Sequence, residues 1–304
     1  MKKIDAHAHV IGHICGIGSE GEARPIGNGM CQYASGKTFR LIPEGYGDYQ
    51  VTPETLLGVM DDNNVEKAIM LQGNYAGFQN LYTHEAMTKY PQRLIGAATY
   101  DPFFYNKHKV IDNLFGNLGF KIIKMEVSNG SGLMANHKTV DLNVELMNEV
   151  YSMANEKKLL FYIDIGRPGN NCYQVDNICE VAKKYPNMNF VVCHLTAPQH
   201  QMHDLLKENL TKLKLDNVYF DLAALPNNSK QPYPFLECQE YLRIACDIVG
   251  SDKLLWGSDF PAAMNFSSYE ESYKYIEDSQ LLNEHEKENI LYNNAKRLLD
   301  EVLA

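Results

Sequence analysis

The sequence has no apolar run of 18 residues, no block of basic residues and no CxxC pair. Without such an apolar run, no segment is suited to cross a membrane as a helix, and the opening MKKIDAHAHV lacks the apolar segment of a signal peptide. The net charge of -10 disfavours nucleic acids and anionic membranes, because both bind through basic surfaces. We therefore expect neither of them as a partner.

The cysteines indicate reduced thiols. There are seven, an odd number, spread over a chain of 304 residues that is large enough to fold without disulfides. With 45% hydrophobic residues, the chain can bury a large core. We expect a cytoplasmic globular protein.

Short apolar runs rich in β-branched and aromatic residues recur along the chain and predict buried strands. The eight runs are Lys3 to His9, Lys67 to Gln72, Leu94 to Tyr100, Phe120 to Val127, Leu159 to Ile165, Asn189 to Leu195, Val218 to Ala223 and Lys253 to Asp259. Helical patterns between them include Thr52 to Asn63, Val144 to Lys157, Val175 to Tyr185 and a helix start at Ala197 and Pro198. This alternation predicts a parallel sheet, and eight strands favour one closed (β/α)8 TIM barrel over residues 1–304, an α/β fold, over an open doubly wound sheet.

The one long irregular stretch is the glycine-rich segment 10–51. It follows the first predicted strand and ends at the helix that begins near Thr52. Loops of this length inside a compact domain are usually functional, so we expect a lid or a substrate wall. A surface insertion without a role is the alternative.

His7 and His9 are two residues apart in the first predicted strand. Their side chains therefore leave the same face and can approach one ion from one side. Two histidines rarely complete a metal site, so a structural role is the alternative for the pair taken alone.

Ionisable residues also end three other predicted strands. Asp164 lies at the end of the fifth and Arg167 just beyond it, His194 ends the sixth and Asp259 ends the eighth. The carboxyl ends of barrel strands meet at one mouth, so these side chains are expected to converge with the histidine pair. The alternatives are a helix cap for Asp259 and a buried histidine bonded to the backbone for His194.

The chain resembles the amidohydrolase superfamily, in the branch that includes aminocarboxymuconate semialdehyde decarboxylase. The resemblance covers nearly the whole chain and is carried by DAHAH, PETLLGVMDDNNVEKAIM, YPQRLIGAATYDP, KKYPNMNFVVCHLT, LLWGSDFP and ENILYNNAKRLL. It implies that His7, His9 and Asp259 bind a metal and that His194 is the catalytic histidine. Asp164 stands where this branch usually has a metal-binding histidine, and we predict it as a ligand that shifts the preference toward oxygen-loving metals. A weaker metal site, or none, is the alternative.

Three further side chains are predicted to contact substrate. Lys124 shares a face with Glu126 on the fourth strand, where a salt-bridged pair or a substrate contact is favoured over a metal-bridging carboxylated lysine. Arg167 can hold a substrate carboxylate through two hydrogen bonds, and His13 lies just beyond the first strand.

The favoured function is that of a metal-dependent hydrolase acting on an amide, a lactone or a related carbonyl compound through a metal-activated water, with His194 and Asp259 handling the proton. Non-oxidative decarboxylation of a small carboxylated substrate is the alternative enzyme, and a binding protein without turnover is the alternative outside enzymes. The cofactor is one divalent metal, with zinc preferred over manganese. The partner is a small-molecule substrate; a homodimer is compatible with the sequence, which does not specify an oligomeric state.

Overall fold

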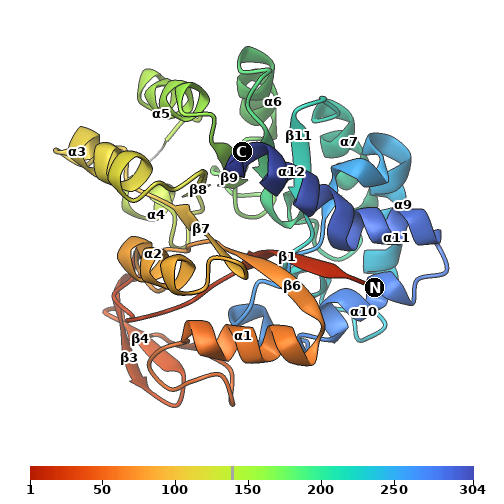
Figure 1. Ribbon diagram of the computed structural model, residues 1–304, viewed down its shortest axis with the longest axis horizontal. Coiled ribbons are helices and arrows are strands. Elements are labelled where there is room, and N and C mark those ends of the chain that lie inside the picture. The colour runs from red at the N-terminus through yellow and green to blue at the C-terminus, as the bar shows by residue number, and fades with distance from the viewer. Residues whose placement is uncertain (138–139) are drawn as a thin grey trace.

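A ring of parallel strands forms the centre of the computed structural model, which describes residues 1–137 and 140–304 (Figure 1). In order along the sheet the strands are β1 (Lys3–Ala8), β6 (Val65–Met70), β7 (Leu94–Ala98), β8 (Ile122–Glu126), β9 (Leu160–Asp164), β10 (Phe190–Val192), β11 (Val218–Asp221) and β12 (Leu254–Leu255). Backbone bonds from Ala6 N to Trp256 O (2.9 Å) and from Asp259 N to His7 O (2.8 Å) join β1 to the segment around β12. The eight predicted strands and the (β/α)8 barrel are confirmed.

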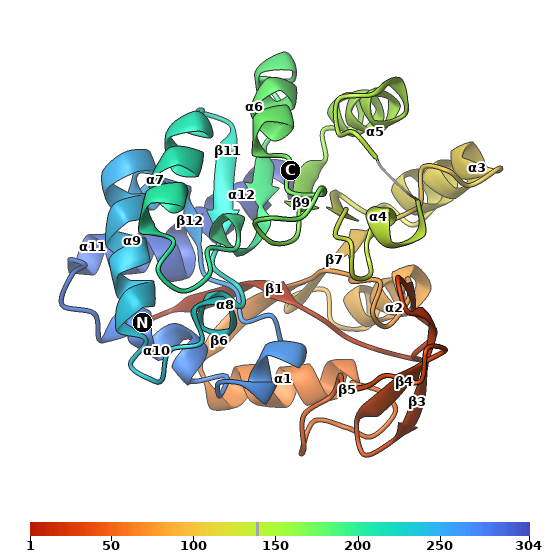
Figure 2. The same ribbon diagram turned by 180° about the vertical axis from the view of Figure 1, so that it is seen from behind.

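Helices cover the outside of this barrel (Figures 1 and 2). The α-helices are α1 (Pro53–Asp62), α2 (Asn80–Lys89), α3 (Lys107–Ile111), α4 (Leu133–Asn136), α5 (Glu145–Glu156), α6 (Val175–Lys184), α7 (His203–Lys212), α8 (Leu225–Ser229), α9 (Leu236–Val249), α10 (Glu271–Glu277), α11 (Glu284–Glu288) and α12 (Asn294–Leu303). Short π-helical segments are η1 (Asp112–Asn117) and η5 (Asn289–Asn293), and 3-10 turns are η2 (Cys193–Thr196), η3 (Ser251–Lys253) and η4 (Ala262–Asn265).

Local sequence explains where α1 begins but not where α7 begins. The Thr52 hydroxyl accepts the N–H of Thr55 and Pro53 occupies the first position of α1, as predicted. The helix start predicted at Ala197 and Pro198 is wrong, because α7 begins at His203. The preceding backbone cannot be helical in the right-handed sense, since residues 194–197 all have positive φ angles.

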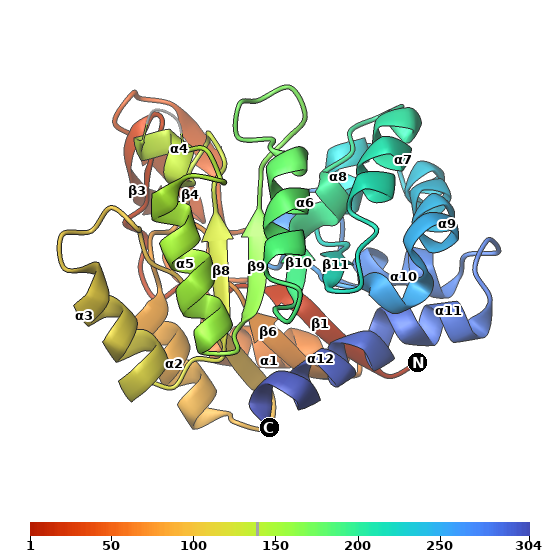
Figure 3. The same ribbon diagram turned by 90° about the horizontal axis from the view of Figure 1, so that it is seen from above.

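Two apolar clusters stabilise the barrel. The smaller one fills its interior with one or two side chains from each of the eight strands and includes Leu298 and Leu299 of α12. The larger one lies between the strands and the surrounding helices, where Tyr151 of α5 packs against Phe161 and Phe190. Figure 3 shows α12 at the end of the barrel opposite to the one toward which β8 and β9 point. This leaves the carboxyl ends of the strands open for a site.

Helix α12 closes one end of the barrel by packing Leu298 and Leu299 into its interior (Figure 3), and this contact gives a stability prediction. Leu299→Ala is expected to lower the free energy of unfolding by about 2 to 5 kcal/mol, because Leu299 is buried in the barrel interior and its loss leaves a cavity. The control is Leu303→Ala on the same helix, where the side chain is 49% exposed and a change below about 0.5 kcal/mol is expected. Urea unfolding measures both, and equal effects would mean that α12 does not close the barrel.

Segment 10–51 is not irregular, contrary to the prediction. It contains an antiparallel sheet of β2 (Ile17–Gly18), β3 (Gly21–Gly27), β4 (Met30–Tyr33) and β5 (Thr38–Arg40). Gly27 and Gly29 turn β3 into β4 at φ angles of 101° and 70°. A side chain at Gly29 would place its Cβ 1.9 Å from the Ile42 carbonyl oxygen, so this glycine is required. Figure 3 shows β3 and β4 at the end of the barrel where the strands finish.

Two further predictions concern the chain as a whole. All seven cysteines are free thiols. In the described residues, no helix combines the length and apolarity needed to cross a membrane.

Candidate metal centre and active site

His7, His9 and Asp259 lie together at the mouth of the barrel. The His9 Nε2 atom is 3.1 Å and the His7 Nε2 atom is 3.6 Å from Asp259 Oδ1, and the two rings are 5.1 Å apart between centroids. The pairing of β1 with β6 shifts register between Asp5 and Ala8, which re-aims the side chains at the end of β1. The structure therefore brings together the three side chains that the sequence predicts to converge.

The outer nitrogens of both rings are already bonded. His7 Nδ1 lies 3.1 Å from Asp221 Oδ2, and His9 Nδ1 lies 2.9 Å from the Leu71 carbonyl oxygen. Because both partners can only accept, each Nδ1 carries the proton and a neutral ring turns the lone pair of its Nε2 toward Asp259. Two lone pairs facing a carboxylate oxygen require a shared proton or a cation between them. This donor set of two imidazoles and one carboxylate fits a divalent metal.

The carboxylate of Asp259 is held in its charged form. Burial by itself raises its pKa. In the metal-free site, where a proton is shared with the imidazoles, the His9 hydrogen bond and the nearby charge of His7 outweigh burial and hold the pKa well below the usual range. The helix-cap alternative does not apply, since the turn η4 begins after Pro261 and has no side-chain cap.

His194 reaches the mouth through an unusual backbone turn. Phe190 and Val192 of β10 pack toward the helices, whereas Val191 and the following Cys193 pack in the barrel interior. Strict alternation would send residue 194 toward the helices. A φ angle of 61° at His194 redirects the chain, and its ring lies 5.0 Å from that of His7.

The two nitrogens of His194 have different partners. Nδ1 lies 2.8 Å from the Ala223 carbonyl oxygen, so it donates, and Nε2 faces Asp164 Oδ2 at 3.4 Å. Burial by itself lowers the pKa of His194, but the bond to Asp164 and its charge outweigh burial and raise the pKa to about 10. Burial likewise raises the pKa of Asp164 by itself, but the bond from His194 outweighs it and holds the pKa of that carboxyl below the usual range.

Asp164 does not join His7, His9 and Asp259 in a common donor group among the residues that the structure describes. Its Oδ1 accepts the Gly166 N–H at 2.8 Å, and its Oδ2 faces His194. The prediction of Asp164 as a metal ligand therefore lacks support from the positions of these side chains.

Asp221, at the end of β11, was missed at the sequence level. It is fully buried, bonds to His7 and also groups with His7 and His194. A signal existed, because Asp221 is the ionisable residue at the end of the seventh predicted strand, just as Asp164 and Asp259 end the fifth and eighth.

Two adjoining cavities open at this centre. One, of about 140 Å³, is walled by apolar residues that include Ile11 and Leu41 of the 10–51 segment and also holds Lys124. The other, of about 350 Å³, is more polar and holds Arg167 and Asn228. Part of segment 10–51 therefore forms a wall of this cavity, which agrees with the wall, rather than the lid, that the sequence analysis expected. Among the described residues, neither lining includes the exposed His13, whose predicted substrate contact is not supported.

Lys124 is buried beside Glu126, with 3.9 Å between Nζ and Oε2. Burial by itself lowers its pKa, but the charges of Glu126 and Asp164 outweigh burial and raise it, so the amine stays cationic. The pairing matches the favoured prediction of a salt-bridged lysine.

Comparisons with known proteins agree with this architecture. The model of a family described as amidohydrolase matches residues 4–300. A probable 2-pyrone-4,6-dicarboxylic acid hydrolase from Acinetobacter baumannii, with citric acid bound, has a TM-score of 0.71 at 18% identity over 99% of this chain and 100% of that one. An amidohydrolase from Burkholderia multivorans with bound zinc has a TM-score of 0.73 at 14% identity over 98% of each chain.

A more distant solved structure is 4-oxalomesaconate hydratase from Rhodopseudomonas palustris. Its TM-score is 0.58 at 19% identity, with 82% of each chain covered. No curated protein sequence is significantly similar to this chain. At these identities the structural likeness shows a shared fold.

Proposed function

The chain belongs to the amidohydrolase family, and we propose that it is a metal-dependent hydrolase of a small carbonyl compound bearing a carboxylate. One observation carries the proposal. The Nε2 atoms of His7 and His9 converge on the Asp259 carboxylate while their Nδ1 atoms are bonded elsewhere. We also propose a cytoplasmic location, on the strength of the free thiols.

In this proposal His7, His9 and Asp259 hold one ion. Two imidazole nitrogens and a carboxylate oxygen favour zinc, with manganese as the alternative. When bound, a divalent ion lowers the pKa of water toward neutrality and polarises a substrate carbonyl. The solved zinc-containing amidohydrolase of the same fold supports this choice of ion.

His194 is proposed to move the proton. Its Nδ1 is fixed on the Ala223 carbonyl, so Nε2 is the nitrogen that exchanges a proton. Asp164 raises the pKa of His194, whereas the charge of an ion held by His7, His9 and Asp259 would lower it, and the ring that has lost its Nε2 proton can accept the proton of the attacking water. Asp164, 3.4 Å from Nε2, stabilises the charged ring that results and allows it to pass the proton to the leaving group. Asp259 is the second carboxylate within reach of the attacking water, and we propose that it assists this transfer.

Lys124 and Arg167 are proposed to bind the substrate from its two sides. The cationic Lys124 lines the smaller cavity and Arg167 lines the larger one. Asn228, which lines the larger cavity with Arg167, is only 6% exposed, and its side chain makes no hydrogen bond to the described residues, which leaves its polar atoms for a ligand. An arginine and a free amide suit a carboxylate.

We propose a cyclic ester with carboxyl groups as the class of substrate. The compound named in the Acinetobacter baumannii structure, 2-pyrone-4,6-dicarboxylic acid, is of this kind. The larger cavity, of about 350 Å³, falls in the range that accommodates small organic ligands.

The test is an assay of purified zinc-loaded protein against carboxylated lactones, amides and aromatic acids. Hydrolysis of a lactone or amide, followed as acid release, is the expected result. Release of carbon dioxide from a substrate that is turned over, without hydrolysis, would replace the hydrolase with a decarboxylase. Absence of turnover with bound zinc across the panel would contradict the proposed reaction.

Arg167→Gln tests the carboxylate contact. We expect kcat/KM for a carboxylated substrate to fall about 10- to 100-fold, because a charged hydrogen-bonded pair is lost. For the methyl ester of the same substrate, a change below about threefold is expected, since no charged pair forms with it. Arg297→Gln, on α12 at the opposite end of the barrel, is the control. Equal losses for acid and ester would contradict the contact.

A further inference from the structure

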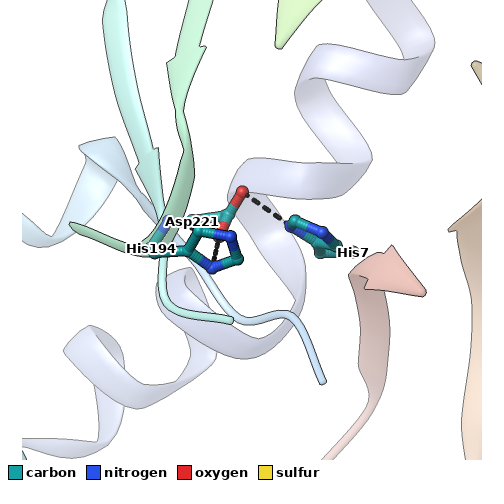
Figure 4. Close-up of side chains that lie close together, drawn as sticks. All are labelled: His7, His194 and Asp221. Atoms are coloured by element: carbon teal, nitrogen blue, oxygen red, sulfur yellow. Dashed lines mark hydrogen bonds and ion pairs between the residues drawn. The ribbon is translucent and has the colours of Figure 1, made fainter. Parts of the chain in front are cut away.

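The Asp221 carboxylate lies between two histidines of the site (Figure 4). Its Oδ2 accepts from His7 Nδ1 at 3.1 Å. Its Oδ1 accepts the backbone N–H of His194 at 2.9 Å and of Ala223 at 3.1 Å. Asp221 is fully buried, so each oxygen is committed to these partners. One side chain therefore touches both the proposed metal ligand and the backbone of the proposed catalytic histidine.

The backbone that carries His194 is strained. Residues 194–197 have consecutive φ angles of 61°, 51°, 61° and 52°. Each non-glycine residue in this left-handed region costs roughly 1 to 2 kcal/mol, so the turn persists only where other contacts hold it. Asp221 stabilises the first residue of this turn, His194, by accepting its backbone N–H.

Near the end of the turn, Thr196 is stabilised by a separate set of hydrogen bonds. The Tyr173 hydroxyl donates to the Thr196 carbonyl oxygen at 2.7 Å, and the Asn209 amide donates to that hydroxyl at 2.7 Å. Tyr173 lines neither cavity among the described residues, so it can act on the site only through the turn.

We propose that Asp221 and Tyr173 are positioning residues for the hydrolysis proposed above, on which this inference rests. Asp221 fixes the proton of His7 on Nδ1, leaving Nε2 free to bind the ion, and it holds the start of the turn that aims His194. Tyr173 holds the end of that turn. Neither residue touches the substrate or the ion.

Two conservative variants separate these roles. Asp221→Asn keeps an oxygen for the N–H groups of His194 and Ala223 but turns an amide N–H toward His7 Nδ1. The His7 proton then moves to Nε2 and blocks the ion. Tyr173→Phe leaves His7 untouched and removes only the bond to Thr196.

The experiment measures zinc affinity of metal-free protein by chelator competition, and kcat and KM at saturating zinc. For Asp221→Asn we expect zinc affinity to fall about 10- to 100-fold with kcat within about fivefold of wild type. For Tyr173→Phe we expect unchanged zinc affinity, KM within about twofold and kcat reduced about tenfold or more. The control is Tyr151→Phe, because the Tyr151 hydroxyl is buried without a partner in the described residues, and neither quantity should change.

Wild-type protein supplies a readout that does not depend on any variant folding. Nitrogen NMR of the metal-free protein is expected to show His7 protonated on Nδ1. A His7 ring protonated on Nε2, or an Asp221→Asn variant with wild-type zinc affinity, overturns the role of Asp221. A Tyr173→Phe variant with wild-type kcat overturns the role of Tyr173. Failure of the proposed function looks different, because wild type itself would then bind no zinc or hydrolyse no substrate.

Discussion

Replacing His9 with alanine is expected to reduce bound metal below about a tenth of an ion per chain and turnover by about a thousandfold or more. The Nε2 atom of His9 is the nitrogen nearest to Asp259, and its Nδ1 bond to the Leu71 carbonyl orients the ring for this role. Without it, His7 and Asp259 alone hold an ion weakly, because zinc sites in enzymes normally have three protein ligands. Elemental analysis after dialysis, paired with the hydrolysis assay, measures both losses.

The matched control for this variant is His200→Ala. His200 is an exposed histidine that pairs with Glu237 at 3.1 Å, outside the lining of both cavities described above. Metal content and turnover should stay within about twofold of wild type. A His9→Ala variant that keeps a full equivalent of metal would show that the ion binds elsewhere.

Replacing His194 with asparagine is expected to separate metal binding from turnover. We expect metal content close to wild type and a fall in kcat of about 10² to 10⁴, which is the usual contribution of general acid-base catalysis. Asparagine is chosen because it tolerates the positive φ angle of 61° at this position, so the turn is preserved. Steady-state kinetics at saturating zinc, with elemental analysis of the same sample, provide the measurement.

The contrast between His9→Ala and His194→Asn distinguishes a metal ligand from a residue that transfers protons. Loss of metal in the His194→Asn variant would make His194 a ligand, whereas turnover within about threefold of wild type would remove it from proton transfer. Unchanged circular dichroism of both variants would exclude unfolding as the cause.

The strands and the meeting of the site residues could be predicted from sequence. Buried strands of a closed barrel read as continuous apolar runs, and the polar residues that end them, such as Asp259, stand out against that background. The small sheet in segment 10–51 could not be predicted in the same way. Its strands are only two to seven residues long and many of their residues are half-buried, so none of them gives the continuous apolar run that marks a barrel strand.

The orientation of individual side chains at the site could not be predicted from the sequence either. Nothing in the letters CHLTAP indicates four consecutive left-handed residues, because the contacts that stabilise the turn come from Asp221 and Tyr173, which are distant in sequence. The position of Asp164 was likewise uncertain, since whether its carboxylate meets the ion or His194 depends on how that turn aims the histidine.

The most direct measurement is a crystal structure of zinc-loaded protein with anomalous data collected at the zinc absorption edge. We predict one peak per chain, with His7 Nε2, His9 Nε2 and an Asp259 oxygen each about 2.0 to 2.2 Å from it. A peak away from these three side chains, or none in protein that elemental analysis shows to contain zinc, would contradict the metal centre on which the proposed hydrolysis depends.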